Sequence, residues 1–136
     1  MLPKLLDAAK QAQRVAYAPY SNYQVGAAVL GTDGKIYAGC NIENASYGLT
    51  MCAERAAISA MISAGCRELT EVAIVTEDGG TPCGMCRQTL AEFTSVPENV
   101  WIHLFDRQGY VGQHRLSELL PAPFSVKPDL ARPLNE

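Results

Sequence analysis

The sequence predicts an α/β protein, a three-layer α/β/α sandwich built around a mixed five-stranded sheet. Short apolar runs typical of strands alternate along the chain with longer segments whose apolar residues recur at helical spacing. Asp33 and Gly34 form a turn signal between the first two strand patterns, which predicts an antiparallel hairpin at the start of the sheet. The segments expected to form strands are 23–29, 36–40, 72–75, 100–105 and 110–114.

Local signals support these strands. Tyr23 and Val25 open an alternation of apolar residues that continues to residue 29, which is the period of a strand. Residues 72–75 are apolar throughout, which suits a strand covered on both faces. Strands and helices alternate between residues 36 and 105, so right-handed crossovers and mostly parallel strands are expected there.

The helices have their own start and stop signals. Pro3 suits the first turn of the first helix, and Pro19 follows its end. The second helix is rich in alanine, which permits close packing on a sheet, and Gly65 fits its C-terminal end. The four segments expected to be helical are 3–17, 53–64, 84–94 and 116–120.

Length and composition indicate one soluble domain. The chain has 136 residues, of which 48% are hydrophobic and 18% charged. We expect a single domain over residues 1–136, with an irregular, proline-rich tail from about residue 125. No apolar run is long enough to span a bilayer, and the N-terminus reads as a helix start, so neither a membrane partner nor a signal peptide is expected.

Charge and cysteine content restrict the partners and the compartment. The formal net charge is −3 and no Lys/Arg cluster occurs, which argues against a nucleic acid polymer and favours a small substrate. Five cysteines are an odd number, which argues against a complete disulfide framework. Free thiols fit a reducing compartment, so we expect a cytoplasmic protein.

Two short motifs, at residues 52–55 and 82–86, place three thiols and one carboxylate at expected helix starts. Cys52, Cys83 and Cys86 can fill three positions of a tetrahedral Zn²⁺ site and leave the fourth for water. Glu54 is then a spare acid, which can act as the general acid and base beside a metal-bound water.

Spacing restricts where these residues can lie on the helices. Cys83 and Cys86 are three apart and share a helix face. Cys52 and Glu54 are two apart and would point to nearly opposite sides in mid-helix, so we expect Cys52 at the cap and Glu54 in the first turn. Two helix N-termini would then face the metal and stabilise the thiolates.

Taken singly, the motifs are ambiguous. Cys-x-x-Cys alone fits a redox motif, half of a structural zinc site or two buried thiols, and Glu54 alone could complement a helix start. In combination they are specific. Cys-x-Glu followed about thirty residues later by Pro-Cys-x-x-Cys is the signature of nucleobase deaminases, with Cys in place of the more usual His.

Over nearly the whole chain the sequence resembles the cytidine deaminases of the small homotetrameric type. The resemblance implies zinc-dependent hydrolytic deamination of cytidine and deoxycytidine to uridine and deoxyuridine, with release of ammonia, in pyrimidine salvage. It also implies a free nucleoside as substrate and a homotetramer whose sites are shared between subunits. The segments that carry the resemblance are, in order, 18–21, 25–28, 39–45, 52–55, 82–88 and 119–124.

The resemblance also assigns roles around the substrate. Asn41 and Glu43, which by residue type fit a polar loop equally well, become the ribose clamp. Tyr23 and Tyr47 are candidates for lining the same pocket, or ordinary core or rim aromatics. Backbone groups of Ala53 and Cys83 are expected to contact the edge of the base.

Two further roles depend on the resemblance. Three thiolates give the zinc site a net negative charge, so an arginine is expected to contact the sulfurs; Arg55 is preferred over Arg87, and either could instead be a solvated helix residue. The resemblance implies that Phe124 stacks on the base in the adjacent subunit. From the residues alone, packing on its own domain is the better interpretation of Phe124.

Two other functions remain open at this level. One is a related small-molecule aminohydrolase, similar to blasticidin S deaminase, and the other is a structural zinc or Cys-x-x-Cys redox module without hydrolase activity. His103 and His114 are expected in packing or surface roles, not as metal ligands. Cys40 and Cys66 are expected to be small buried residues.

Overall fold

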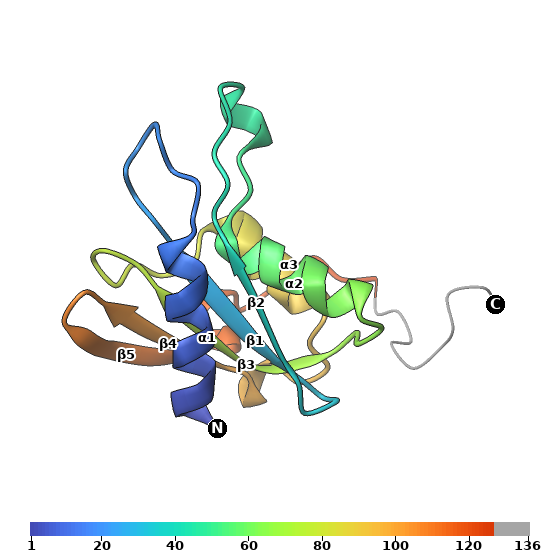
Figure 1. The fold of residues 1–136 in the computed structure, drawn as a ribbon. Helices are drawn as coiled ribbons and strands as arrows, with labels where there is room; N and C mark the ends of the chain where they lie inside the picture. The colour runs from blue at the N-terminus through green and yellow to red at the C-terminus, as the bar shows by residue number, and fades with distance from the viewer. Residues whose placement is uncertain (127–136) are drawn as a thin grey trace.

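A mixed sheet forms the centre of the chain in the computed structural model, which describes residues 1–126 (Figure 1). Within these residues the sheet has five strands in the order β2-β1-β3-β4-β5. The predicted irregular tail falls mostly on residues 127–136, outside the described part of the chain. The strands are β1 (Gly26–Gly31), β2 (Ile36–Cys40), β3 (Leu69–Val75), β4 (Trp101–Asp106) and β5 (Gly109–Arg115).

The strand directions agree with the predicted hairpin and refine the prediction of parallel strands. β1 is antiparallel to both β2 and β3, β3 is parallel to β4, and β4 is antiparallel to β5. β2, β3 and β4 therefore run in the same direction, as expected for residues 36–105. However, β2 and β3 are not neighbours, because β1 lies between them and pairs with both.

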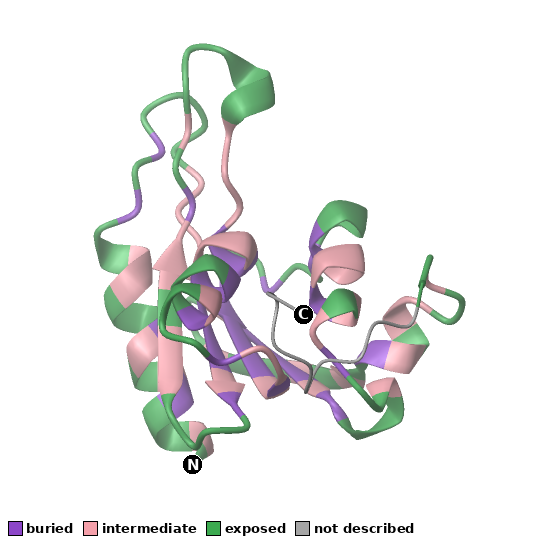
Figure 2. Ribbon diagram, turned by 90° about the vertical axis from the view of Figure 1, so that its right-hand side faces the viewer, coloured by how far each residue is buried: buried purple, intermediate pink, exposed green. Residues whose placement is uncertain are grey.

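Helices cover both faces of this sheet, which confirms the three-layer prediction. α1 lies on one face, and α2 and α3 lie on the other, as the two views show (Figures 1 and 2). Ala28 and Ala73 pack with the α1 residues Leu5 and Ala9, whereas the alternate strand residues pack toward α2 and α3. The helices are α1 (Leu2–Arg14), α2 (Ala53–Ser63), α3 (Gly84–Glu92) and α4 (Leu116–Leu119), with 3-10 turns η1 (Tyr47–Leu49) and η2 (Pro97–Asn99).

The start of the first strand differs from the prediction, and hydrogen bonds explain why. The first strand was expected from Tyr23, but β1 begins at Gly26. The Asn41 side chain accepts a hydrogen bond from the Val25 backbone N–H (2.9 Å) and donates one to the Tyr23 carbonyl oxygen (2.8 Å). The Asn41 side chain thus bonds the backbone groups of residues 23 and 25 that would otherwise pair with a neighbouring strand. The alternating apolar pattern therefore begins before the strand does.

The histidines and the other two cysteines lie away from the predicted metal ligands. His103 is buried on β4, where its Nε2 lies 3.0 Å from Glu71 Oε2, and His114 is half-buried on β5. Cys66 is buried as expected, whereas Cys40 is only half-buried. Among the described residues, no helix combines the length and the apolar character that crossing a bilayer requires.

Gly39 sets the distance between β2 and α2. A Cβ atom added to Gly39 would lie 2.5 Å from the Ala57 nitrogen and 2.6 Å from the Ala56 Cβ. Real Cβ atoms do not approach other atoms this closely, so the absence of a side chain lets α2 rest directly on the strand. Because Cys52 is the N-cap of α2, this contact also helps to set the position of the Cys52 sulfur relative to the sheet.

Replacing Gly39 with alanine should lower the free energy of unfolding by about 1–3 kcal/mol, the usual cost of overpacking. Gly112→Ala is the matched control, since a Cβ atom there meets nothing within 4 Å, and it should change stability by less than about 0.5 kcal/mol. Denaturant titration at equal subunit concentration measures both. Equal stability of the two variants would show that α2 can shift without cost.

Candidate active site

Two helix N-termini bring three cysteines together. Cys52 is the N-cap of α2 and Cys83 the N-cap of α3, while Cys86 lies in the first turn of α3. The three Sγ atoms all lie within 4.8 Å of one another, and those of Cys83 and Cys86 are 3.4 Å apart. The predicted positions of Cys52 at the cap and Glu54 in the first turn are confirmed.

The backbone around these caps favours negative charge. Cys52 and Cys83 both have extended backbone angles, and neither side chain makes a cap hydrogen bond. The first amides of a helix have no partner inside it, and the helix dipole is positive at this end. Two such ends meet at the sulfurs, which lowers the cost of holding thiolates together there.

Three clustered sulfurs suit a Zn²⁺ ion. Thiolates are strong zinc ligands, and three of them leave one tetrahedral position free, as catalytic sites require. The hydrogen bond from Cys86, together with Arg55, lowers the pKa of the Cys52 thiol to about 5. The same bond to Cys52, followed by burial, raises the pKa of Cys86.

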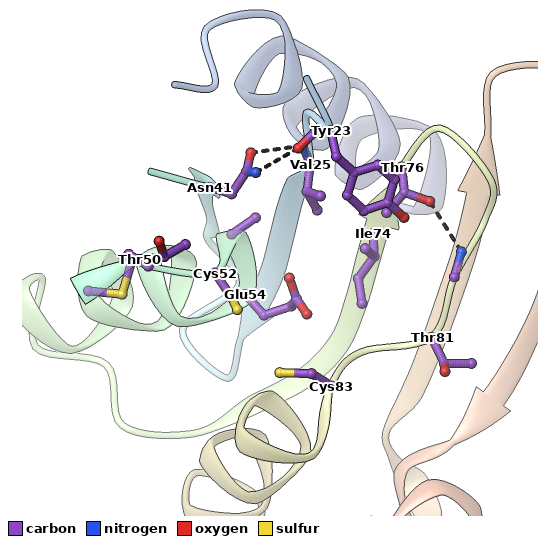
Figure 3. A pocket seen from close by; sticks show the side chains of 13 residues that line it. Tyr23, Val25, Asn41, Thr50, Cys52, Glu54, Ile74, Thr76, Thr81 and Cys83 are labelled. Carbon is purple, nitrogen blue, oxygen red and sulfur yellow. Dashed lines mark hydrogen bonds between the residues drawn. The ribbon is translucent and has the colours of Figure 1, made fainter. Parts of the chain in front are cut away.

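Glu54 lies beside this cluster and is almost fully buried, with 5% of its surface exposed. Its carboxylate lies beside the Cys52 and Cys83 sulfurs and faces Ile74 across the cavity (Figure 3). Burial raises the pKa of Glu54, because the charged form loses solvent. A buried acid next to a metal site is placed to hold and release a proton.

The two arginines have different surroundings. The Arg55 guanidinium lowers the pKa of the nearby Cys52 thiol, and its Nη2 donates to the Thr50 carbonyl oxygen at 3.1 Å. Arg87 instead donates to the Pro82 carbonyl (2.7 Å), the Leu119 carbonyl (2.9 Å) and Thr81 Oγ1 (3.0 Å). Arg55 is therefore placed to balance charge at the sulfurs, whereas Arg87 joins the start of α3 to α4.

A cavity of about 220 Å³ opens above Glu54 and the sulfurs (Figure 3). Tyr23, Val25 and Asn41 form one wall, and Ile74 lies opposite Glu54. Glu54 is the acid of the lining, which contains neither lysine nor arginine. The complete lining is Tyr23, Val25, Asn41, Thr50, Met51, Cys52, Ala53, Glu54, Ile74, Thr76, Gly80, Thr81 and Cys83.

The predicted ribose clamp is divided between two hollows. Asn41 and Tyr23 line the cavity, but Glu43 and Tyr47 line a neighbouring hollow with Tyr20, and Thr50 borders both. The Glu43 carboxylate accepts hydrogen bonds from the Tyr20 N–H (2.8 Å), the Ser21 N–H (3.1 Å) and the Ser21 hydroxyl. Asn41 and Glu43 thus both organise the segment before β1.

Phe124 is not packed against the core formed by the described residues. The residue is 80% exposed. Its backbone N–H donates to Gln88 Oε1 (3.2 Å), and its carbonyl oxygen accepts from Gln88 Nε2 (2.8 Å). The packing interpretation from the residues alone is therefore wrong. A fixed backbone presents an aromatic ring to solvent in the isolated chain.

Sequence reasoning did not single out several residues of the cavity wall. Thr50 and Met51 directly precede Cys52, and Thr81 precedes the second motif, so nearness to the motifs could have indicated them. Ile74 and Thr76 come from β3 and its end, where no local signal marks a role. Only the strand order brings these two residues next to Glu54.

Three sulfur ligands leave one zinc position for water, and a buried acid that is not a ligand lies beside them; this combination is typical of zinc-dependent hydrolases. Residues 2–103 match the sequence profile described as the cytidine and deoxycytidylate deaminase zinc-binding region. The chain therefore belongs to the cytidine and deoxycytidylate deaminase family, and Zn²⁺ is its cofactor.

Similar proteins agree with this assignment. The cytidine deaminase of Sporosarcina psychrophila is 44% identical over 132 residues, which cover 94% of this chain and 93% of that protein. The cytidine deaminase of Halalkalibacterium halodurans is 46% identical over 125 residues, or 90% and 93% of the two chains. The crystal structure of cytidine deaminase from Burkholderia pseudomallei superimposes with a TM-score of 0.83 at 44% identity, covering 91% of this chain and 99% of that one.

Replacing Arg55 with alanine should weaken zinc binding about 10- to 100-fold, a size typical for partners of metal ligands. The thiolates lose the positive charge beside Cys52, and competition with a chromophoric chelator measures the change. Arg14→Ala, which removes an exposed guanidinium on the opposite side of the sheet, is the control and should keep the parent affinity. Parent-like zinc affinity in Arg55→Ala would contradict the charge-balancing role.

Proposed function

We propose that this chain catalyses the hydrolytic deamination of cytidine and deoxycytidine, giving uridine and deoxyuridine with release of ammonia. The observation that carries the proposal is the buried Glu54 carboxylate beside Cys52, Cys83 and Cys86 at the inner end of a small cavity. The family and the names of the similar proteins support the choice of cytidine.

We assign the three cysteines as the zinc ligands and Glu54 as the proton carrier. Bound zinc supplies a Lewis acid that lowers the pKa of a water molecule. Glu54 takes a proton from the attacking water and delivers it to N3 of the pyrimidine, which makes C4 electrophilic. Glu54 then takes the proton of the hydroxyl that has added to C4 and passes it to the amino group, so that the C4–N bond breaks, ammonia leaves and the C4 carbonyl forms. The backbone of Ala53 and Cys83, beside the ligands, orients the base edge.

The cavity favours a nucleoside over a nucleotide. The matched family profile includes deoxycytidylate deaminases, whose name implies a phosphorylated substrate. Here the lining holds no cation to pair with a phosphate, and Glu54 lies within it. A phosphate dianion would enter uncompensated, so deoxycytidine should be turned over far better than its monophosphate.

Asn41 and Glu43 keep capacity for ribose hydroxyls. An amide has two N–H donors and an acceptor oxygen with two lone pairs, and Asn41 uses one donor and one acceptor position in the fold. The Glu43 carboxylate accepts three hydrogen bonds in the fold and has about four lone-pair sites. We propose that both bind the sugar while their structural bonds hold their orientation.

Glu54→Gln should retain zinc but lose at least about 10²-fold in turnover of cytidine, because each general acid or base step contributes ~10²–10⁴. Ammonia release and zinc content by atomic absorption are measured on the same preparation. Glu92→Gln, an exposed acid at the end of α3, is the control and should remain active. A zinc-replete Glu54→Gln enzyme with near-normal turnover would exclude Glu54 as the proton carrier.

The site is completed, in our proposal, by neighbouring subunits of a homotetramer. The cavity of about 220 Å³ is smaller than the roughly 300–1,000 Å³ usual for ligand sites, so one chain encloses only part of a nucleoside. Two adjacent loops project from the body of the chain (Figures 1 and 2). They carry large exposed apolar side chains, and such patches mark interfaces. These residues are Tyr17, Tyr20, Ile42, Tyr47 and Leu49.

Phe124 is then the group that one subunit lends to the next. Its ring is exposed and its backbone is fixed by Gln88, so it can stack on a base in an adjacent cavity with little loss of freedom. Tyr47, at the tip of its projecting loop, is suited to approach a neighbouring cavity in the same way. We therefore propose that Phe124 and Tyr47 both contact the substrate bound in a neighbouring subunit.

Phe124→Ala should lower kcat/KM by about 5- to 150-fold, because base stacking on an aromatic ring contributes ~1–3 kcal/mol. Mixed oligomers of Phe124→Ala and Glu54→Gln subunits should be more active than either parent, since neighbouring pairs regain one intact site. The control mixes Phe124→Ala subunits with subunits that carry both Glu54→Gln and Phe124→Ala. These subunits supply no phenylalanine ring, so the mixture should show no gain in activity. Absence of gain in verified mixed oligomers, or a fully active monomer, would contradict shared sites.

The cellular setting follows from the same features. All five cysteines are free, and three of them are needed as thiolates, which fits a reducing cytoplasm. The chain acts as one domain, since strands from both halves form one sheet around one site. A free nucleoside as substrate supports our proposal that the enzyme acts in pyrimidine salvage.

A further inference from the structure

The Tyr23 hydroxyl is already bonded within the protein. Tyr23 lines the cavity, but its hydroxyl donates to Asp78 Oδ1 at 2.6 Å. Its backbone is held on both sides, because its N–H donates to Ser21 Oγ (3.0 Å) and its carbonyl accepts from Asn41 (2.8 Å). The ring therefore links a fixed wall of the cavity to the segment that contains Asp78.

Asp78 is the centre of the loop between β3 and α3. Its Oδ1 also accepts hydrogen bonds from the Gly80 N–H (3.2 Å) and the Thr76 hydroxyl (3.3 Å). Thr76 Oγ1 in turn accepts from the Gly79 and Gly80 amides at 2.7 and 3.2 Å. These bonds fold the loop on itself, whereas the bond from Tyr23 joins it to a segment 55 residues away.

The loop has little room to move on its other side. Gly79 is buried with φ of 74°, and a Cβ atom there would lie 2.5 Å from Val111 Cγ2. Between Val111 and Tyr23, Gly80 and Thr81 form part of the cavity wall (Figure 3), and the chain continues through Pro82 to Cys83. The loop therefore connects the substrate wall directly to a cysteine of the sulfur cluster.

We propose that the Tyr23–Asp78 hydrogen bond is a latch that positions the Gly80–Thr81 wall and thereby sets nucleoside affinity. Tyr23 acts through its hydroxyl on the loop and not on the substrate, and Asp78 is a positioning residue. The proposal rests on the nucleoside deaminase function proposed above. It extends that function by joining Asn41, on the sugar side of the cavity, to the loop that carries Cys83.

Donor and acceptor keep their roles near neutral pH. Burial, and then the bond to Asp78, raise the pKa of Tyr23, so the phenol stays protonated. The bond from Tyr23 is the main cause that lowers the pKa of Asp78, so the carboxylate stays ionised. A neutral O–H donating to a carboxylate is stronger than a bond between neutral groups.

Three variants and a double variant test the latch. Tyr23→Phe removes only the hydroxyl, Asp78→Ala removes the acceptor, and Asp78→Asn keeps an acceptor oxygen. Tyr23→Phe should raise KM for cytidine about 3- to 10-fold with kcat within about twofold, since one partly exposed bond is lost. Asp78→Ala should raise KM at least as much, since it also removes the acceptor of the Gly80 and Thr76 bonds. The double variant should match Asp78→Ala, and Asp78→Asn should largely restore KM.

Glu77→Ala is the matched control. Glu77 is the neighbouring acid of the same loop, but its carboxylate pairs with Arg107 on the β4–β5 turn. It should leave KM at the parent value. A Tyr23→Phe effect without an Asp78→Ala effect, or additive effects in the double variant, would overturn the latch and assign the hydroxyl to the substrate.

Backbone amide exchange gives a readout that does not need activity. The Gly79 amide, which bonds to Thr76 and not to Asp78, should exchange faster in substrate-free Tyr23→Phe than in the parent, and about as fast as in Asp78→Ala. Gly80 should exchange faster still in Asp78→Ala, which also removes its direct bond to the carboxylate. Unchanged exchange in both variants would refute the latch. If the parent releases no ammonia from cytidine, the proposed function fails, while the exchange measurement still decides whether the bond holds the loop.

Discussion

Three sulfur atoms from two helices must meet at one point, and the rest of the structure serves this requirement. Cys52 and Cys83 are N-caps of different helices, so both helix starts have to reach the same end of the sheet. The small residue at position 39 brings α2 down onto β2, and Arg87 ties the start of α3 to α4. A shift of either helix would separate the sulfurs before it disturbed the core.

The two residues of the proposed ribose clamp also hold the fold. Asn41 replaces ladder hydrogen bonds at the entry to β1, and Glu43 gathers the backbone of residues 20 and 21. Their bonds to the chain fix the side chains before any ligand arrives, which reduces the entropy lost on binding. Substitution of either residue removes hydrogen bonds that hold the fold, in addition to the proposed contact with the sugar.

The sequence predicted the features that depend on residues close together in the chain, such as the helix positions of the site residues. The spacing of Cys52, Glu54, Cys83 and Cys86 restricted their helix positions, because side-chain direction in a helix depends only on the number of residues between them. The insertion of β1 between β2 and β3 could not be predicted, since strand neighbours are set by pairing over long separations. For the same reason, the division of Asn41 from Glu43 and the contact of Tyr23 with Asp78 had no local signal.

The closeness of Cys83 and Cys86 also has a consequence for durability. Their sulfurs lie 3.4 Å apart, and Cys83 is on the exposed side of the cluster. While zinc occupies the site, both thiolates are committed to the metal. Once zinc is lost, an oxidant can join the pair as a disulfide, which removes two ligands at once and prevents reloading. Metal loss and oxidation therefore reinforce each other. In an oxidising medium the lost activity should return only when a reductant and zinc are both added.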